Sequence, residues 1–375
     1  MAELAPLAAD AKAWLFDKAG PLWAGAGLTE NGLFAELLGP DGRAVASPLR
    51  LRVQARQIYS LCELGRLGWS GPWREAASRG LDALFRHGRR EDGFFVHKLN
   101  MDGSVADARA DLYDHAFVLF ALVNGGQALE RPELIAEGGR LMDLIEAHWA
   151  HPAGGFREGE VDPQPPRRQN PHMHMTECSI AYWRAGAPER WAEQARRLAA
   201  LSHARWIDAG TGAITELFND DWSRTPEREG DHVEPGHCLE WTWLQENLTQ
   251  LGVDGVAASD GLVAFARTHG VDPARNVAVN ETELDGAPRD PSARLWPQTE
   301  RLKAALARWR RTGETAEIEE AARAYAGLRQ YLDAPGPGLW RDKLKPDGGW
   351  VEEPSPASSF YHIVCALSEL IGAAG

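Results

Sequence analysis

Residues 92–103, DGFFVHKLNMDG, place a glycine, a run of apolar residues and an Asp-Gly pair close together. An apolar run that ends on Asp-Gly is typical of a short β-hairpin or extended loop. The pattern returns as NGLFAELLGPDG (31–42), GGFREGEVD (154–162), GAITELFNDDW (212–222), NVAVNETELDG (276–286) and GLWRDKLKPDG (338–348). Self-similarity at a fixed period is the signature of a repeat architecture, so this repeat decides the fold.

The segments between the hairpins predict helices, because their apolar residues recur at helical spacing. The repeats begin at Gly32, Gly93, Gly155, Gly212, Asn276 and Gly338. The intervals contain paired helices, expected over 48–66 and 71–87, 109–125 and 131–148, 172–185 and 189–205, 236–251 and 255–270, and 293–311 and 315–331. Single helices over 2–18 and 357–372 would complete a sixth pair. We therefore expect an all-α (α/α)6 barrel, with short hairpin loops and one catalytic domain over residues 1–375.

The composition limits the kinds of molecule that the protein is expected to bind. The chain has 375 residues, 44% of them hydrophobic, and a net charge of −14, which opposes binding to nucleic acid or to an anionic membrane. The first residues lack a signal-peptide pattern, and four scattered cysteines suggest neither a disulfide framework nor a zinc knuckle. We expect a cytoplasmic protein with a small-molecule partner and no cofactor, which could form a homo-oligomer.

Polar residues gather where the inner helices of such a barrel would begin. The motifs are ARQIYS, DLYDHAF, NPHMHMTEC, EPGHCLEW, RLWPQTERLKA and PASSFYHIV, one from each helix pair. Their chemistry-bearing residues are Arg56, Asp111, Asp114, His115, Asn170, His172, His174, Glu177, His237, Glu240, Arg294, Trp296, Gln298, Glu300, Tyr361 and His362. Four repeats that offer His115, His174, His237 and His362 at a similar phase favour an active site over isolated core histidines.

Residues outside this pattern are interpreted as structural or solvated. They are His87, His97, His148, His151, His203, His232 and His269, with Trp14, Trp149, Trp206 and Trp309 expected in the core. By contrast, Trp241 and Trp296 lie within the polar motifs, where an aromatic ring could stack on a sugar.

A metal site is the main alternative to metal-free chemistry. His174 with Glu177 and His237 with Glu240 share a His-x-x-Glu spacing, the reverse of the Glu-x-x-His pairs in di-iron bundles. A second pair of inward glutamates is not evident in the sequence, so we expect no metal. Two histidines can act as acid and base without one.

The motifs resemble the N-acylglucosamine 2-epimerase superfamily, which includes mannose isomerases, sulfoquinovose-type isomerases and cellobiose 2-epimerases. The resemblance is carried by RVQARQIYS, DLYDHAF, NPHMHMTEC, EPGHCLEWTWL, RLWPQTERLKA and FYHI, in order along nearly the whole chain. It implies a barrel that opens a sugar ring and moves the C2 proton through a cis-enediolate. It implies an acid-base pair at His237 and His362, an enediolate-stabilising Arg56, substrate-orienting His174 and Glu240, and a sugar-contacting Trp296.

The further substrate-binding residues are expected from the convergence of the motifs at the funnel. They are His115, Asp111, Asn170, Glu177, Gln298 and Tyr361. The start of a helix disfavours an imidazolium, which would keep His237 neutral as a base, while Glu240 could orient the ring or partly offset this effect. The sequence leaves the sign of the net pKa shift of His237 open.

The motif wording is closest to bacterial mannose isomerases, so we expect interconversion of a free aldose and ketose of the mannose/fructose type. A sugar 2-epimerase acting on N-acylglucosamine, glucose/mannose or cellobiose is the alternative. A phosphosugar fits the acidic composition less well, although Arg167 and Arg168 leave room for an anionic substituent. More remote alternatives are a glycoside hydrolase using carboxylates such as Asp114 and Glu240, and a non-catalytic helical-repeat binding protein.

Overall fold

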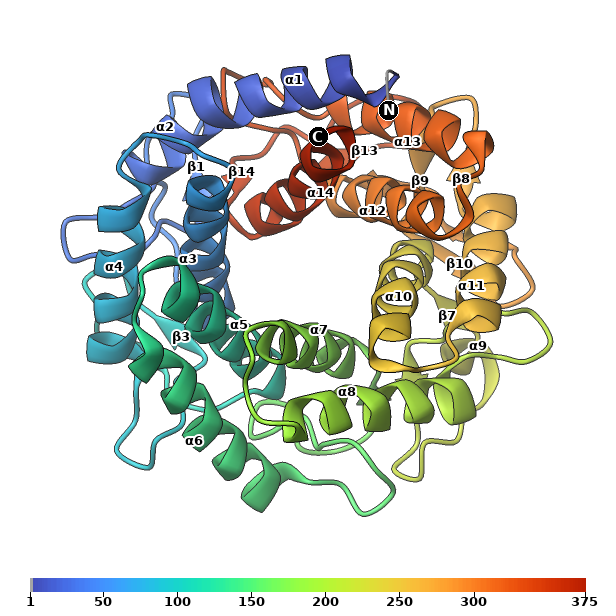
Figure 1. Cartoon of the computed structure of the whole chain (residues 1–375), viewed down its shortest axis with the longest axis horizontal. Coiled ribbons are helices and arrows are strands. Elements are labelled where there is room, and N and C mark those ends of the chain that lie inside the picture. The colour runs from blue at the N-terminus through green and yellow to red at the C-terminus, as the bar shows by residue number, and fades with distance from the viewer. Residues whose placement is uncertain (1–2) are drawn as a thin grey trace.

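Two concentric rings of helices form the computed structural model, which describes residues 3–375 (Figure 1). The inner helices are α3 (Leu51–Arg66), α5 (Leu112–Ala128), α7 (Asn170–Arg184), α10 (Pro235–Leu248), α12 (Leu295–Thr312) and α14 (Ser358–Ala374). The outer helices are α1 (Leu4–Trp14), α4 (Trp73–Ala83), α6 (Pro132–Trp149), α8 (Arg190–Leu201), α11 (Val256–His269) and α13 (Thr315–Arg329). Each inner helix contacts the next, and α14 contacts α3, so the ring closes as an (α/α)6 barrel.

The two ends of the chain supply the sixth helix pair, as the repeat predicts. Outer helix α1 packs against inner helix α14, and Figure 1 shows the two helices next to each other. The first helix was expected over 2–18; residue 2 lies outside the described residues. It continues beyond 18, through a π-helical turn (Leu15–Ala19) into α2 (Gly20–Ala24). Pro21 stands in the first turn of α2, where a missing N–H is tolerated, so the Gly-Pro pair does not end the helix.

Short irregular turns extend three other helices. The π-helical turns Leu84–Gly88 and Ser202–Trp206 follow α4 and α8, and the 3-10 turn Thr249–Leu251 follows α10. These extensions bring the helix ends within a few residues of the predicted ones. One short helix, α9 (Glu227–Gly230), had no counterpart among the expected helices.

Strand pairs tie the start of each inner helix to the hairpin of the next repeat. The pairings are β2 (Leu49–Arg50) with β3 (Lys98–Leu99), β5 (Arg167–Arg168) with β6 (Leu217–Phe218), β7 (His232–Val233) with β10 (Glu281–Glu283), β12 (Ala293–Arg294) with β13 (Lys343–Leu344), and β14 (Ser355–Pro356) with β1 (Leu37–Leu38). Within the hairpins, β4 (Val105–Asp107) pairs with β3 and β11 (Pro288–Asp290) with β10, while β8 (Val271–Asp272) pairs with β9 (Val277–Ala278). Asp111, before α5, makes a single bridge to Gly159. The hairpins therefore hold the N-terminal ends of the inner helices at one mouth of the barrel.

The core lies between the two rings and takes most of the expected tryptophans. Trp14, Trp149 and Trp206 are buried, whereas Trp309 is half-buried. All four cysteines are buried free thiols. In residues 3–375, no helix combines the length and the apolar character that crossing a membrane would require.

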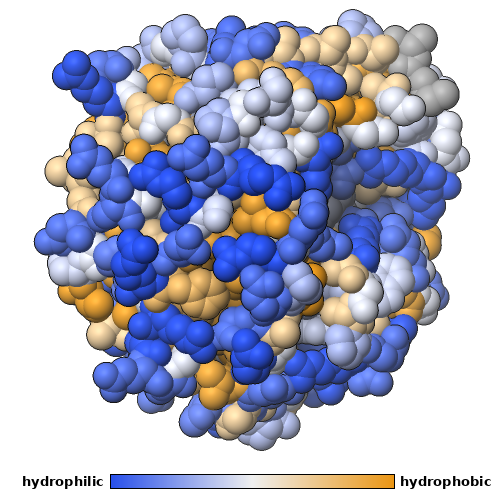
Figure 2. All heavy atoms as spheres, turned by 60° about the vertical axis from the view of Figure 1, so that its left-hand side comes forward, coloured by the Kyte–Doolittle hydropathy of each residue, from blue (hydrophilic) through white to orange (hydrophobic). Residues whose placement is uncertain are grey.

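The visible outer surface in Figure 2 is mainly hydrophilic, with apolar residues scattered among charged ones. Among the described residues, Val105 is the exposed large hydrophobic side chain. A helical-repeat binding protein would present an apolar groove for its partner, so this surface gives the binding-protein alternative no support.

Candidate active site

A cavity of about 440 Å³ opens where the inner helices begin. Its lining draws on all six inner helices and on the segments that precede them. The predicted residues that line it are Arg56, Asp111, Asn170, His174, His237, Glu240, Arg294, Trp296 and His362. The convergence expected from the repeat therefore holds for the residues to which the resemblance assigns catalytic and substrate-contacting roles.

The fifth or sixth residue of an inner helix supplies most of the polar groups at the centre of the barrel. These residues are Arg56, His174, Glu240, Glu300 and His362, all less than a tenth exposed. Because they occupy similar places on neighbouring helices of a closed ring, their side chains converge. The sequence places ionisable groups at these positions and an apolar core around them.

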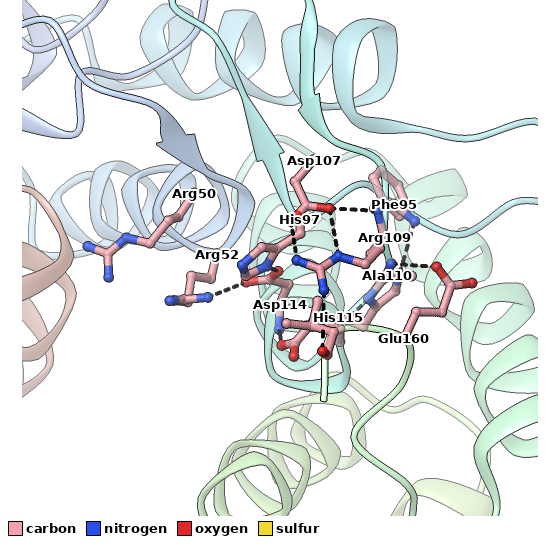
Figure 3. Close-up of polar contacts among 12 residues, drawn as sticks. Arg50, Arg52, Phe95, His97, Asp107, Arg109, Ala110, Asp114, His115 and Glu160 are labelled. Carbon is pink, nitrogen blue, oxygen red and sulfur yellow. Dashed lines mark hydrogen bonds and ion pairs between the residues drawn. The ribbon is translucent and has the colours of Figure 1, made fainter. Parts of the chain in front are cut away.

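A second repeated position serves the fold instead. The His115 ring accepts a hydrogen bond from the Phe95 backbone N–H at 3.0 Å and donates to the Asp111 carbonyl at 2.7 Å. Figure 3 shows His115 and Phe95 among the residues of this polar cluster. Burial lowers the pKa of His115 to about 4, so the ring is neutral. We expected His115 to bind substrate in the funnel. The structure differs: both of its ring nitrogens form hydrogen bonds with backbone groups, and His115 does not line the cavity.

On three other inner helices, a side chain near the helix start also forms hydrogen bonds with the backbone of a hairpin. His172 accepts from the Phe156 backbone N–H at 2.9 Å, and Gln298 clamps both backbone groups of Ala278 at 2.7 and 2.8 Å. Gln54 does the same for Phe34. Gln298 and His172 therefore also lie outside the cavity lining, holding hairpins against helix starts.

His237 is held by a carboxylate that the sequence motifs did not suggest. Its Nδ1 donates to Glu216 Oε1 at 2.9 Å, and Glu234 Oε2 lies 3.9 Å away. Burial alone would lower the pKa of His237, but the charges of Glu216 and Glu234 raise it to about 10. The raised pKa favours the imidazolium at neutral pH, whereas the helix start alone would favour the neutral ring. Two nearby carboxylates outweigh the helix dipole.

His362 has the opposite protonation state. Its Nδ1 donates to Glu300 Oε1 at 2.9 Å, which leaves Nε2 as the free nitrogen of the ring. Burial lowers the pKa of His362 to about 3, with Arg56 and Lys303 acting in the same direction. The lowered pKa favours the neutral ring at pH 7, with Nε2 free to accept a proton.

Trp296 lies between the two histidines. Its ring centroid is 4.9 Å from that of His237 and 5.7 Å from that of His362. The indole is mostly buried and lines the cavity. A flat aromatic surface between an acid and a base suits a sugar whose C–H face stacks on the ring.

Arg56 places a fixed positive charge at the base of the cavity. The guanidinium lies 4.0 Å from the Phe117 ring centroid, and its Nη2 donates to the Tyr113 hydroxyl at 2.7 Å. Stacking and hydrogen bonding hold the planar group in one orientation, as required of an oxyanion donor.

His174 lines the cavity and belongs to a third histidine-carboxylate pair, whose carboxylate lies behind the cavity wall. His174 Nδ1 donates to Glu177 Oε2 at 3.1 Å, and the Tyr361 hydroxyl donates to the same carboxylate. Burial lowers the pKa of His174 to about 4. Glu177 and Tyr361 do not line the cavity, so the structure assigns them to the support of His174 rather than to substrate contact.

The rim carries a fourth such pair, which the sequence interpretation placed among structural histidines. His97 Nδ1 bonds Asp114 Oδ2 at 2.6 Å, and Arg52 Nη1 donates to Asp114 Oδ1 at 2.9 Å, as Figure 3 shows. His97 and Asp111 line the cavity, whereas Asp114 is fully buried beneath them. The assignment of His97 outside the site is therefore wrong.

Comparison with known proteins decides the family. The profile of the family described as N-acylglucosamine 2-epimerase matches residues 32–366. The chain belongs to the N-acylglucosamine 2-epimerase family. It is a sugar isomerase or epimerase.

Three relatives illustrate the range of this family. A protein of Rhizobium meliloti (strain 1021) named mannose-6-phosphate isomerase is 41% identical over 95% of each chain. A protein of Thermobifida fusca named D-mannose isomerase is 27% identical over 71% of this chain and 72% of its own. The solved structure of a cellobiose 2-epimerase from Bacillus thermoamylovorans B4167 superposes with a TM-score of 0.89 at 17% identity, covering 98% and 99% of the two chains. The last likeness is one of fold.

Metal-ligand geometry in this family member is confined to groups that already contain a positive charge or a proton donor. Ligand-type atoms come within 4.8 Å of one another in four groups of the described residues: His97, Asp111 and Asp114; His174, Glu177 and Glu240; Glu216, Glu234 and His237; and Glu240, Glu300 and His362. Arg52 pairs with Asp114 in the first, Tyr361 donates to Glu177 in the second, protonated His237 lies in the third, and Lys303 pairs with Glu300 in the fourth. In each group at least one residue therefore already pairs with a positive charge or a proton donor within the protein.

Sequence reasoning missed the carboxylate partner Glu216, although the repeat contains a signal for it. The fourth residue after the repeat's first position is polar in five repeats: Glu36, His97, Glu216, Asn280 and Asp342. In the structure His97, Glu216 and Asp342 bond to side chains at the starts of inner helices. A polar residue within an otherwise apolar hairpin thus marks a support of the active site.

Proposed function

We propose that this protein is a metal-free aldose-ketose isomerase that interconverts a free aldose and ketose of the mannose/fructose type. The observation that carries the proposal is the pair of histidines beside Trp296, each held by a carboxylate and with pKa values shifted in opposite directions. Proton transfer next to a carbonyl needs a base and an acid at the same time. The isomerase outcome is supported by the names of the two sequence relatives.

The steps balance with the two histidines alone. Nε2 of neutral His362 takes the proton from C2 of the open-chain aldose. The electron pair forms the C1–C2 double bond, and negative charge develops on O1 beside Arg56. His237 gives its proton to O1 and takes one from O2, and His362 then returns its proton to C1. Both histidines end in their starting states, and the product is the ketose.

A 2-epimerase uses the same first step, with the proton returning to C2 from the opposite face. His237 would then be the donor, and its protonated state suits that role as well. The solved cellobiose 2-epimerase shares the fold with this chain. Product identification separates the two outcomes, since only an isomerase gives a ketose.

A phosphorylated substrate is the second candidate, favoured by four arginines that line the cavity near its mouth. They are Arg50, Arg52, Arg168 and Arg294. Each already pairs with a carboxylate, at Glu36, Asp114, Asp162 and Asp342 respectively. The buried Arg167 likewise bonds Glu158 and Asp220. A phosphate would have to displace these partners, so we favour the uncharged sugar.

The hydrolase alternative is not favoured by the geometry. Asp114, one of its two carboxylates, is bonded by Arg52 and His97 and does not line the cavity.

We also propose that the reaction takes place in the cytoplasm, because four free thiols suit a reducing compartment.

The test is incubation of the purified protein with mannose, glucose, N-acetylmannosamine, cellobiose and mannose 6-phosphate, followed by product identification. The proposal expects fructose from mannose, with a kcat/KM higher than that for the phosphorylated sugar. Formation of glucose without fructose would replace the proposal with epimerisation. Turnover of mannose 6-phosphate alone would show that the rim arginines bind phosphate.

A further inference from the structure

Beneath the cavity, one lysine serves two buried carboxyl groups. Lys303, on α12 one turn after Glu300, is fully buried, and its Nζ lies 2.7 Å from Glu300 Oε2. The same Nζ is 4.0 Å from Glu240 Oε1 and 4.0 Å from the centroid of the Trp243 ring. Lys303 does not line the cavity, so it does not touch a bound sugar.

A buried ammonium is costly unless it has a partner, and this one is arranged asymmetrically. The closer carboxylate, Glu300, has its pKa lowered to about 2, because Lys303 and His362 outweigh the effect of burial. The more distant Glu240 has a pKa well above its ordinary value, through burial and the charge of Glu300. The one positive charge therefore lies nearer to Glu300 and lowers the pKa of that acid, while the pKa of the more distant Glu240 stays raised.

The two acids consequently have different contacts. Ionised Glu300 accepts the Nδ1 proton of His362, which fixes the tautomer with Nε2 unprotonated. Glu240 lines the cavity, and its buried Oε1 has no hydrogen-bond partner among the described residues. The Glu240 carboxyl group can therefore form a hydrogen bond with a sugar hydroxyl at this point.

We propose that Lys303 is a positioning residue of the isomerisation: it selects Glu300 as the carboxylate that holds His362 in its proton-accepting tautomer and leaves Glu240 as the carboxyl group that faces the sugar. This inference rests on the proposed role of His362 as base. Lys303 acts through Glu300, and its contribution disappears when Glu300 can no longer be ionised.

Other titratable and charged groups also face this cluster, and the test takes them into account. They are Arg56 from α3, Glu177 from α7, Tyr361 and Cys365 from α14, and His237 from α10. All of them remain in the variants below, so a change between variants reports on Lys303 and Glu300.

The experiment compares Lys303→Met, Glu300→Gln and the double variant. Arg301→Gln is the matched control. Arg301 lies on the same helix, and its buried ion pair with Glu320, at 2.6 Å, faces away from the cavity. Initial rates are measured from pH 4 to 10 on the sugar that is turned over best, with circular dichroism to confirm folding.

Lys303→Met is expected to lower kcat about 10- to 100-fold at pH 7, since a wrongly held histidine tautomer is costly even when the base remains. The acidic limb of its pH profile should move to higher pH, because the lost ammonium no longer opposes protonation of His362. In the Glu300→Gln background, Lys303→Met should change kcat less than threefold, as expected of two residues that act as one unit. Arg301→Gln should lower the melting temperature without moving the pH profile.

A measurement without substrate keeps this inference separate from the proposed function. In protein with 15N-labelled histidine, His362 Nε2 should be unprotonated at pH 7 and should become protonated in Lys303→Met, with His362→Asn assigning the signal. An unchanged tautomer in folded Lys303→Met would overturn the inference, whatever sugar is turned over. The inference would also be overturned if Lys303→Met lowered kcat by the same factor in the unmodified protein and in Glu300→Gln. If Lys303→Met does not fold, the double variant is compared with Glu300→Gln. The double variant removes the ammonium and its partner carboxylate together, so neither charge is left unpaired in the core.

Discussion

Replacing Glu216 with glutamine should change the pH at which the enzyme loses its acid. The substitution keeps the size and hydrogen-bonding capacity of the side chain but removes the charge nearest to His237, at 2.9 Å. The rise of the His237 pKa from 6.5 to about 10 corresponds to roughly 5 kcal/mol in favour of the imidazolium, at about 1.4 kcal/mol per unit. Because Glu234 is 1.0 Å farther away (3.9 against 2.9 Å), we assign at least half of this to Glu216. The pKa should then fall by about two units, to about 8.

The assay is the pH dependence of kcat/KM, which reports ionisations of the free enzyme. An acid must be protonated to act, so activity is lost as the pH rises through its pKa. The alkaline limb should therefore move from about pH 10 in the unmodified enzyme to about pH 8 in Glu216→Gln. Glu234→Gln should move it less, and Glu283→Gln, in a surface ion pair, should leave it in place. An alkaline limb that stays at its original pH in folded Glu216→Gln would refute the argument that His237 is the acid.

Three further outcomes are expected. Arg56→Lys should lose about 10²–10³-fold in kcat/KM, because a point charge cannot replace the guanidinium fork at the oxyanion; a loss below threefold would remove Arg56 from the chemistry. His115→Gln should keep the activity, since Gln54 makes the equivalent clamp in another repeat. With a folded-state pKa of about 4 against 6.5, neutral His115 gives stability that is present above pH 6.5 and lost as the pH falls toward 4, so thermal unfolding of His115→Gln should be less sensitive to that pH range. Treatment with a chelator should leave turnover unchanged, and recovery of lost activity by a divalent ion would contradict the metal-free mechanism.

The fold could be predicted because the same sequence pattern occurs six times along the chain. Six hairpins at a nearly constant interval leave room for two helices each, and the unpaired first and last helices imply closure. The extension of the first helix beyond residue 18 could not be predicted, because Gly20 and Pro21 are typical helix breakers and the π-helical turn before them depends on packing.

The candidate site was predicted less completely, for a geometric reason. His115 and His174 stand at similar distances from their helix starts, but each residue turns the chain by 100°, and a difference of one position separates the hairpin clamp from the cavity wall. The protonation state of His237 needed a contact with Glu216, which lies 21 residues earlier and on a hairpin. Helix-dipole reasoning from the local sequence could not include that charge.

The central claim is that His362 moves a proton between C2 and C1 of the sugar, and isotope transfer tests it most directly. Mannose is incubated in heavy water, and the position of deuterium in recovered sugar and product is determined by NMR. The account predicts deuterium at C1 of fructose and, on the return reaction, at C2 of mannose, because the His362 proton can exchange in a cavity open to solvent. The same incubation with His362→Asn should give neither label nor product. Fructose that forms without solvent deuterium, while keeping all of the label from mannose deuterated at C2, would indicate a hydride shift and contradict the account.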